Sequence, residues 1–323
     1  MTAPGAHAGA GLPSRDAAIR TGSKSFAMAA RLFDPATRDL VWDLYTWCRH
    51  CDDVVDGQTL GHDRREVADR PARLDALHAG TSAAFAGTAA PGDPFGALGR
   101  VVAATGLPRR LADDHLAGFA MDVDGRSYRT MAETLDYCYH VAGVVGLMMA
   151  WVMGVRDRAV LARASDLGMA FQLSNIARDV GDDARAGRVY LPADRLRAEG
   201  AVVVAGAAPG PGEAAGVARV VATLLDDAER YYDSAWHGIA HLPWRSAWAV
   251  ATARLVYRDI GRAVRRRGGA AWASRTVVPT PRKLAALAGA GLQVAWLRVP
   301  PRPDPSTPAR VGLFTPAALD LLG

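Results

Sequence analysis

The chain has 323 residues and a mass of 34.1 kDa; half of its residues are hydrophobic and 22% are charged. This composition describes a globular protein with a large core and excludes an intrinsically disordered chain. The formal net charge is +5, but the basic residues are spread along the sequence and their tightest run, 265–267, is typical of a solvated helix end, so no nucleic-acid partner is expected.

Helical spacing of apolar residues continues along almost the whole chain, whereas alternating strand-like runs are scarce. We therefore predict an all-α protein. Loop-forming residues interrupt the pattern at 87–96, at 205–216 and from 300 onward. The composition does not change across these interruptions, so we predict one domain spanning 1–323. The ends, about 1–14 and 300–323, are predicted to be disordered.

The first residues of the chain and its cysteine content indicate the compartment in which the protein is expected. Its first twenty residues lack a basic segment followed by an apolar core, so no secretion signal is predicted. With three cysteines in total, a reducing cytoplasm is the expected location.

The stretch "TGSKSF" (21–26) contains Lys24, one of only two lysines among 38 basic residues. A compact ammonium between Ser23 and Ser25 suits phosphate oxygens, although a serine-capped helix start fits the same residues.

A row of polar residues follows in "DLYTWCRHCDDVVDG" (43–57). Each residue of an α-helix advances about 100°, which places Tyr45, Arg49, Asp52 and Asp56 within roughly 60° of arc and Asp53 to their side. The same helix contains "CRHC" (48–51). Cysteines inside a helix do not match a zinc knuckle or a redox turn, so we interpret them as small buried apolar side chains.

Two interior helices are predicted in the middle of the chain. The longest uncharged run, 141–155, is shorter than the roughly 20 residues that a membrane-spanning helix needs, so we interpret it as a helix buried in protein. In "FQLSNIARDVGDD" (171–183), Gln172, Asn175, Asp179 and Asp183 fall within roughly 80° of arc. Apolar residues flank this second row, and Ala, Gly and Ser elsewhere on the helix allow neighbouring helices to approach closely.

Two inward rows of carboxylates predict positive charge between them, because burying unpaired carboxylates is costly. Oxygen ligands without histidine or thiolate partners select Mg²⁺ or Mn²⁺ over zinc, and Mg²⁺ typically shares a few carboxylates with substrate phosphates. Asn175, the only asparagine in the chain, supplies a carbonyl oxygen without adding negative charge. The alternative is that both rows are solvated helix faces, paired with Arg49 and Arg178.

Weaker signals lie towards the C-terminus. "GPGEAAG" (210–216) is similar to a dinucleotide-binding glycine pattern, but it contains a proline and lacks the βαβ context, so we interpret it as a flexible loop. Tyr257 in "VYRDIG" and Arg275 in "ASRTVVP" are further candidate phosphate contacts. Spacing alone does not single them out.

Over about residues 19–284, the chain resembles the squalene/phytoene synthase family, and within it the bacterial phytoene synthases most closely. The segments that carry the resemblance are "GSKSFAMAARLF", "LYTWCRHCDDVVDG", "GFAMDV", "YCYHVAGVVGLMM", "FQLSNIARDVGDDARAGRVYLP" and "GIAHLPWRSAWAVATARLVYRDIG". The resemblance implies an all-α isoprenoid synthase fold, in which helices surround a central apolar cavity with the two aspartate-rich motifs facing each other at its mouth. Met148, Met149, Trp151 and Met153 then become candidates for its wall, with ordinary core packing as the alternative.

Matching the family's motifs residue by residue implies roles for positions of this sequence. The implied metal ligands are Asp52 and Asp56 on one side and Asn175, Asp179 and Asp183 on the other. The implied contacts with diphosphate or with the prenyl chain are Gly22, Ser23, Lys24, Ser25, Tyr45, Arg49, Gln172, Arg178 and Tyr257, to which Arg275 is added as a candidate. Ser174, Gly181 and Asp182 depart from the family's usual residues without removing an implied ligand.

The implied activity is a Mg²⁺-dependent prenyl transfer, with Mn²⁺ as the alternative metal. Two geranylgeranyl diphosphates would be joined head to head through prephytoene diphosphate to 15-cis-phytoene, in carotenoid formation, without NADPH. Because the product is a hydrocarbon, loose contact with a membrane is expected, and contact with other carotenoid enzymes is a further expectation. Two alternatives stay open: the same fold acting on farnesyl diphosphate to make dehydrosqualene or squalene, and a non-catalytic helical protein that binds prenyl lipids.

Overall fold

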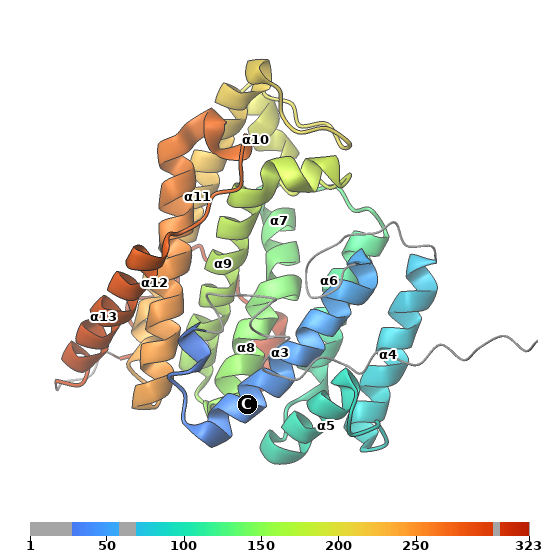
Figure 1. Cartoon of the computed structure of the whole chain (residues 1–323), viewed down its shortest axis with the longest axis vertical. Coiled ribbons are helices and arrows are strands. Elements are labelled where there is room, and N and C mark those ends of the chain that lie inside the picture. The colour runs from blue at the N-terminus through green and yellow to red at the C-terminus, as the bar shows by residue number, and fades with distance from the viewer. Residues whose placement is uncertain (1–27, 58–68, 300–303, 323) are drawn as a thin grey trace, which may run out of the picture.

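A computed structural model describes residues 28–57, 69–299 and 304–322 (Figure 1). Every regular element in these ranges is helical, which confirms the predicted all-α class. The Gly22–Ser25 segment lies outside the described residues. The α-helices are α3 (Pro35–Asp56), α4 (Arg70–Ala86), α5 (Pro94–Thr105), α6 (Arg109–Val123), α7 (Met131–Cys138), α8 (Val144–Val152), α9 (Arg158–Arg185), α10 (Ala193–Ala198), α11 (Pro211–Ile239), α12 (Trp244–Arg267) and α13 (Thr280–Trp296); η1 (Tyr139–Gly143) is a π-helix, and η2 (Gly268–Trp272) and η3 (Ala317–Leu321) are 3₁₀-helices.

Local sequence sets where the two helices with acidic rows begin and end. The Asp34 carboxylate accepts a hydrogen bond from the Thr37 backbone N–H at 3.0 Å, and Pro35 opens the first turn of α3. Gly57 ends α3 in the left-handed region, with φ of 64°. Asp157 caps α9 in the same way as Asp34 caps α3. Side-chain caps of this kind satisfy backbone donors that a helix start leaves free.

Helix α9 lies at the centre of the bundle, between α8, α11 and α12 (Figure 1). Two glycines allow α9 to approach the helical stretch beside it. A Cβ atom at Gly168 would lie 2.1 Å from the Ala142 carbonyl oxygen, and one at Gly146 would lie 2.2 Å from the Ala164 carbonyl oxygen. The predicted close approach of neighbouring helices to α9 is therefore confirmed, and it depends on the absence of side chains at these crossings.

Most of the predicted helix at 141–155 belongs to a longer helical stretch that begins earlier and ends at residue 152, so residues 153–155 lie outside it. Elements α7, η1 and α8 form a continuous helical stretch, Met131–Val152, with one π-helical turn. These 22 residues meet the length and apolarity of a membrane span, and this is the one such stretch within the described ranges. Half of it is buried inside the protein, where α8 packs against α9. A core helix of a soluble protein passes the same test, so length and composition alone assign no membrane here.

The C-terminal segment 304–322 packs against the helical body, which differs from the predicted disorder of 300–323. Buried Arg163 of α9 donates to the carbonyl oxygens of Pro305 and Pro308, the former at 3.0 Å. Arg310 makes a bidentate pair with the carboxylate of Asp166, which is 0% exposed. The proline-rich sequence of this segment predicted a disordered tail, but charged groups buried in α9 hold it in place.

The predicted loops and helix ends are largely confirmed. The break at 87–96 contains the turn before α5, and the run 265–267 does end α12. The break at 205–216 is shorter than predicted, because Pro211 occupies the first turn of α11 and "GPGEAAG" begins that helix. No strand precedes α11 in the described part of the chain, so the glycine pattern lacks the βαβ context that a dinucleotide site requires.

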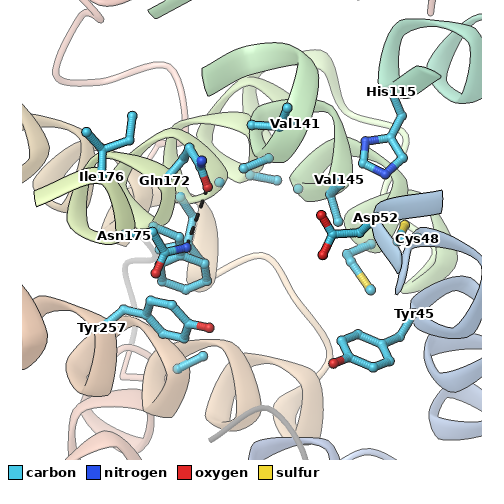
Figure 2. Close-up of a pocket in the computed structure, with 18 of the residues that line it drawn as sticks. Tyr45, Cys48, Asp52, His115, Val141, Val145, Gln172, Asn175, Ile176 and Tyr257 are labelled. Atoms are coloured by element: carbon cyan, nitrogen blue, oxygen red, sulfur yellow. Dashed lines mark hydrogen bonds between the residues drawn. The ribbon is translucent and has the colours of Figure 1, made fainter. Parts of the chain in front are cut away.

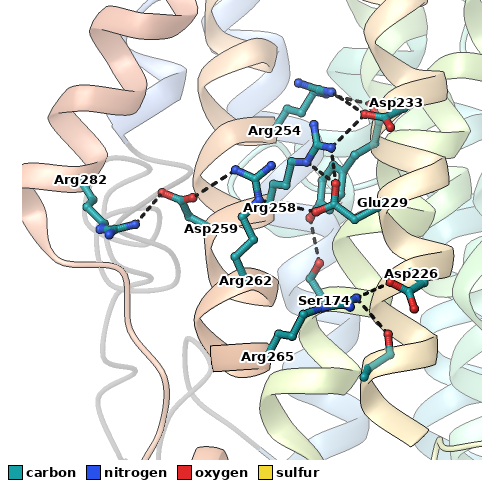
Figure 3. A network of polar contacts seen from close by, with 12 residues as sticks. Ser174, Asp226, Glu229, Asp233, Arg254, Arg258, Asp259, Arg262, Arg265 and Arg282 are labelled. Carbon is teal, nitrogen blue, oxygen red and sulfur yellow. Dashed lines mark hydrogen bonds and ion pairs between the residues drawn. The ribbon is translucent and has the colours of Figure 1, made fainter. Parts of the chain in front are cut away.

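Ion pairs connect α11, α12 and α13 (Figure 3). Arg258 of α12 contacts Glu229 at 2.5 Å and Asp233 at 3.0 Å, both on α11. Asp259 of α12 in turn lies 3.8 Å from Arg282 at the start of α13. These contacts hold α12 in a fixed position relative to α11, and Tyr257 on an adjacent side of α12 lines the central cavity.

Candidate functional site

A cavity of about 1090 Å³ runs through the middle of the helical array. Along α9 its lining extends from Val160 to Arg185, which corresponds to about 37 Å at the rise of an α-helix. Every predicted site residue within the described ranges lines it: Tyr45, Arg49, Asp52, Asp56, Gln172, Asn175, Arg178, Asp179, Asp183, Tyr257 and Arg275. The alternative that placed the two acidic rows on outer helix faces is therefore wrong in that placement, although the pairing with Arg49 and Arg178 that it included is present.

The two rows face each other across this cavity. Figure 2 shows Tyr45 and Asp52 on α3 opposite Asn175 on α9, with Tyr257 of α12 beside Asn175. Both rows occupy the C-terminal halves of their helices, and Asp56 is the last residue of α3. The C-terminus of a helix disfavours negative charge, so these carboxylates lie where the helices themselves offer no stabilisation.

Arginines from the same helices neutralise part of this charge. On α3, Arg49 lies 2.9 Å from Asp52 and 2.8 Å from Asp53. On α9, the Arg178 guanidinium donates to both carboxylate oxygens of Asp179, through Nε at 2.7 Å and through Nη2. Arg275 approaches Asp179 from the segment after η2, with its Nε 3.6 Å from the carboxylate.

Further charged residues that were not assigned from the sequence line the cavity, among them Arg188 and Asp122. Arg188, in the turn after α9, pairs with Asp56 through both Nη atoms and so connects the two acidic helices. Asp122 of α6 adds a third carboxylate, which accepts hydrogen bonds from Tyr190 at 2.8 Å and from Tyr137 at 3.0 Å. Both residues belong to segments that carry the family resemblance. For Asp122, the presence of an aspartate within the otherwise apolar "GFAMDV" could have indicated a site residue.

Burial of the carboxylates shifts their titration. Burial raises the pKa of Asp52 to about 6, against the lowering effect of Arg49. Burial, with the Asp179 charge as the next cause, raises the pKa of Asp183 to about 8. The pKa of Asp122 is also raised, mainly by burial. Burial disfavours the charged form of these three carboxyl groups, and a cation bound beside them would stabilise it.

The residues at this end of the cavity fit a divalent cation bound together with an anionic substrate. Asn175 donates to Gln172 at 3.5 Å, but its side-chain oxygen is buried and has no hydrogen-bond partner among the described residues. An unsatisfied buried oxygen beside two carboxylates is a ligand position for a hard cation. The described residues contain no cluster of three or more Asp, Glu, His or Cys that would hold an ion alone.

The remainder of the cavity is apolar, and it corrects the predicted wall. Met149 and Met153 line it, together with Val145, one turn before Met149, and Val141, two turns before it. Met148 is buried away from it, and the Trp151 indole instead donates to the Thr105 carbonyl oxygen at 3.0 Å. Helical geometry explains the difference, because residues four apart share a face of α8 and the intervening positions point elsewhere.

The cysteines act as apolar side chains, as predicted. Cys51 and Cys138 are buried, Cys48 lines the cavity beside Asp52, and all three are free. Burial raises the pKa of each thiol above its ordinary value. A thiol that resists ionisation is a poor metal ligand and a poor nucleophile, which agrees with a site built from oxygen donors.

Comparison with known proteins identifies what this geometry resembles. The family model described as squalene/phytoene synthase matches residues 19–283. The chain is 52% identical to the 15-cis-phytoene synthase of Pantoea ananas over 290 residues, which cover 88% of this chain and 93% of that protein. It is 50% identical to the 15-cis-phytoene synthase of a Paracoccus species over 283 residues, covering 88% and 91% of the two chains.

Solved structures agree in fold. A dehydrosqualene synthase crystallised with a ligand superimposes with a TM-score of 0.73 at 26% identity, covering 87% of this chain and 95% of that one. A squalene synthase from Alicyclobacillus acidocaldarius superimposes with a TM-score of 0.67, also at 26% identity, over 79% and 92% of the two chains. Both are enzymes with the isoprenoid synthase fold that the sequence motifs implied.

Proposed function

Since this chain belongs to the squalene/phytoene synthase family, we propose that it joins two molecules of geranylgeranyl diphosphate head to head to form 15-cis-phytoene. The observation that carries the proposal is the division of one cavity into two parts. One end holds facing carboxylates and arginines, and the rest is an apolar channel. A prenyl diphosphate has the same division, with a charged head and a long hydrocarbon chain.

The charged end would bind and activate the diphosphate. Asp52 and Asp56 on α3 and Asn175, Asp179 and Asp183 on α9 would hold Mg²⁺, with Mn²⁺ as the alternative. When bound, the metal supplies positive charge that stabilises a leaving diphosphate. Arg49, Arg178, Arg188 and Arg275 line the same end and present guanidinium groups that suit diphosphate oxygens.

The apolar part would position the reacting chains and protect them from water. Loss of diphosphate from one substrate gives an allylic cation, which the double bond of the second substrate attacks. Loss of a proton then closes the ring of a cyclopropyl diphosphate. A second ionisation, a rearrangement and loss of a proton complete the hydrocarbon. Tyr257 and Phe171 stack at 4.2 Å in the cavity wall, and aromatic faces of this kind stabilise a nearby cation without reacting with it. These reaction steps consume no reductant, so no NADPH requirement is proposed.

The proposed setting is the cytoplasm, with loose contact at a membrane surface that accepts the hydrocarbon product. This is supported by the chemistry of the product, which is insoluble in water. Contact with other enzymes of carotenoid formation belongs to the same proposal.

The test is an extraction assay on the purified full-length chain. The protein is incubated with Mg²⁺ and either geranylgeranyl or farnesyl diphosphate, with and without NADPH, and with a chelator as control. Products are separated by chromatography and identified by absorbance. The expected result is phytoene from the longer substrate, independent of NADPH and lost with the chelator.

Other outcomes distinguish the alternatives. Product from farnesyl diphosphate alone would keep the mechanism and replace the substrate with the shorter one, giving dehydrosqualene without NADPH or squalene with it. Tight binding of prenyl diphosphates without any product would contradict the proposed reaction and favour a non-catalytic binding protein.

A further inference from the structure

Helix α13 carries an exposed apolar face. Large side chains on it are strongly exposed: Leu284 by 55%, Leu292 by 75%, Trp296 by 72% and Val299, just after the helix, by 64%. Helical spacing places these residues on one side, with exposed small residues between them. We call this the α13 outer face, and its members are Pro281, Leu284, Ala285, Ala288, Leu292, Ala295, Trp296 and Val299.

The opposite side of α13 already has a partner. Ala286, Ala290, Val294 and Leu297 are buried there, and α12 is the helix against which α13 packs. A helix that is apolar on both sides is typical of a protein interior, yet α13 lies at the edge of the array in the described part of the chain (Figure 1). Large apolar side chains gathered on one exposed face indicate an interaction surface.

The charges around this face select its partner. Residues 260–303 contain nine basic residues and no aspartate or glutamate. Exposed Arg282 stands beside Lys283 at the start of α13, and exposed Arg245 begins α12, the helix that packs against α13. A second copy of the chain would bring the same positive charge against this surface, whereas an anionic surface complements it.

We propose that the α13 outer face docks the protein on a membrane surface that contains anionic lipids. Its leucines and tryptophan insert at the level of the lipid head groups, and the flanking cations lie against the head-group charges. The face is also close to the apolar part of the cavity. Arg298 donates to the carbonyl oxygen of Leu242, whose side chain lines that cavity. Docking there would bring the hydrocarbon-binding end of the protein to the bilayer.

The test is co-sedimentation of the full-length protein with phosphatidylcholine vesicles, with and without phosphatidylglycerol, in the absence of substrate. Wild type is expected to bind the anionic vesicles and to be released by salt. The double variant Leu292→Glu/Trp296→Glu should bind at least about tenfold more weakly. The matched control, Val202→Glu/Val204→Glu, changes the charge equally at two exposed valines in the loop before α11 and should stay within about threefold of wild type.

Three results would overturn the proposal: absence of wild-type binding to either vesicle, equal binding by the α13 variant, or a wild-type dimer that the α13 variant converts to a monomer. The last would assign the face to a second copy of the chain. Thermal unfolding of each variant verifies that it is folded. Because no prenyl substrate is present, failure of docking leaves the proposed reaction untouched, and the extraction assay decides that reaction separately.

Discussion

At the scale of single residues, the cavity carboxylates are poorly placed for stability and well placed for binding a cation. Replacing Asp52 or Asp179 with asparagine keeps the size of the side chain and removes the charge. We expect turnover to fall at least about 10³-fold in either variant, because leaving-group stabilisation supplies much of the rate in such reactions. Steady-state rates with geranylgeranyl diphosphate measure the effect.

Asp53 provides the matched control for this prediction. It is a neighbour of Asp52 and pairs with Arg49, but it does not line the cavity. Asp53→Asn should therefore retain activity within about tenfold of wild type. Turnover of Asp52→Asn equal to that of Asp53→Asn would show that the row facing the cavity has no special role.

His115 makes the stability of the fold depend on pH. Its ring packs between Trp47 and Phe119, Nδ1 lies 3.2 Å from the His140 carbonyl oxygen, and burial lowers its pKa to about 4. Below pH 6.5 the unfolded chain binds a proton that the folded chain excludes, so stability falls with decreasing pH through the window from 6.5 to 4. We expect this residue to account for a loss of roughly 2.5 kcal/mol between pH 7 and 4.5.

Urea unfolding of wild type and His115→Gln at both pH values isolates this effect. The variant lacks the titrating group, so the difference in unfolding free energy between the two proteins should change by that amount. A difference that stays constant with pH would mean that the buried ring does not exclude the proton. His140, which faces His115, is present in both proteins and cancels in the comparison.

The site residues differ in how far sequence could predict them. Periodicity alone placed Asp52, Asp56, Asp179 and Asp183 on inward faces, because the helical repeat fixes which residues share a face. It missed Arg188, since that residue lies in a turn after α9 and its pairing with Asp56 depends on how two distant helices pack. Asp122 was missed because a single aspartate forms no row.

At the scale of helices, the packing of α9 against η1 and α8 depends on glycine. Gly168→Ala would place a Cβ 2.1 Å from a backbone oxygen and should destabilise the protein by about 3 kcal/mol, because backbone cannot move aside cheaply. Gly289 in α13 faces open space, and a Cβ atom added there would have no neighbouring atom within 4 Å. Gly289→Ala should instead stabilise by about 0.5–1 kcal/mol through helix propensity.

Denaturant unfolding of both variants compares the two effects directly. Equal and small changes would contradict the close approach of α9 to its neighbour. The comparison is informative because the two substitutions are chemically identical and differ only in what surrounds the new methyl group.

The wall formed by α8 sets the space for the prenyl chain. Met149→Trp fills the apolar part of the cavity without touching its charged end. We expect the ratio of kcat/KM for geranylgeranyl over farnesyl diphosphate to fall at least about tenfold, because the longer chain needs the lost volume. Met148→Leu, at the adjacent position that is buried outside the cavity, should leave the ratio unchanged.

Competition assays with both substrates measure this ratio. If Met149→Trp slowed both substrates equally, the wall would not determine chain length. Sequence indicated a methionine-rich helix but could not say which of its residues reach the cavity, because the π-helical turn η1 and the packing on α9 set its rotation.

At the scale of the whole molecule, the buried carboxylate of Asp166 binds the C-terminal segment 304–322 to α9. Asp166 is 0% exposed, pairs with Arg310, and lies near the buried cation of Arg163. Asp166→Asn leaves two cations without their anion and should cost about 3–5 kcal/mol. Arg158→Met, which removes an exposed pair between α9 and Asp320 in the same segment, should cost less than about 1 kcal/mol.

Thermal and denaturant unfolding of the two variants, with limited proteolysis of residues 304–322, provide the measurement. Rapid cleavage is expected in Asp166→Asn alone. Equal resistance to protease in both variants would mean that other contacts hold the segment.

The all-α fold class could be predicted from the sequence, whereas the packing of residues 304–322 against α9 could not. Helical periodicity and the family's motifs extend over most of the chain, so all-α architecture followed from many residues at once. The segment after residue 300 lacks periodicity, and its order depends on Arg163 and Asp166, which lie more than a hundred positions earlier. Contacts between such distant residues leave no local pattern.

The separation of charge and apolar lining along α9 has an evolutionary consequence. Residues near Asp179 and residues near Val160 line one cavity and lie about 28 Å apart along α9, a distance at which substitutions usually act independently. Selection can therefore alter the length of hydrocarbon accepted while leaving the chemistry of bond formation unchanged. A cavity of this design lets one ancestral catalyst give rise to descendants that differ in substrate size and share a reaction.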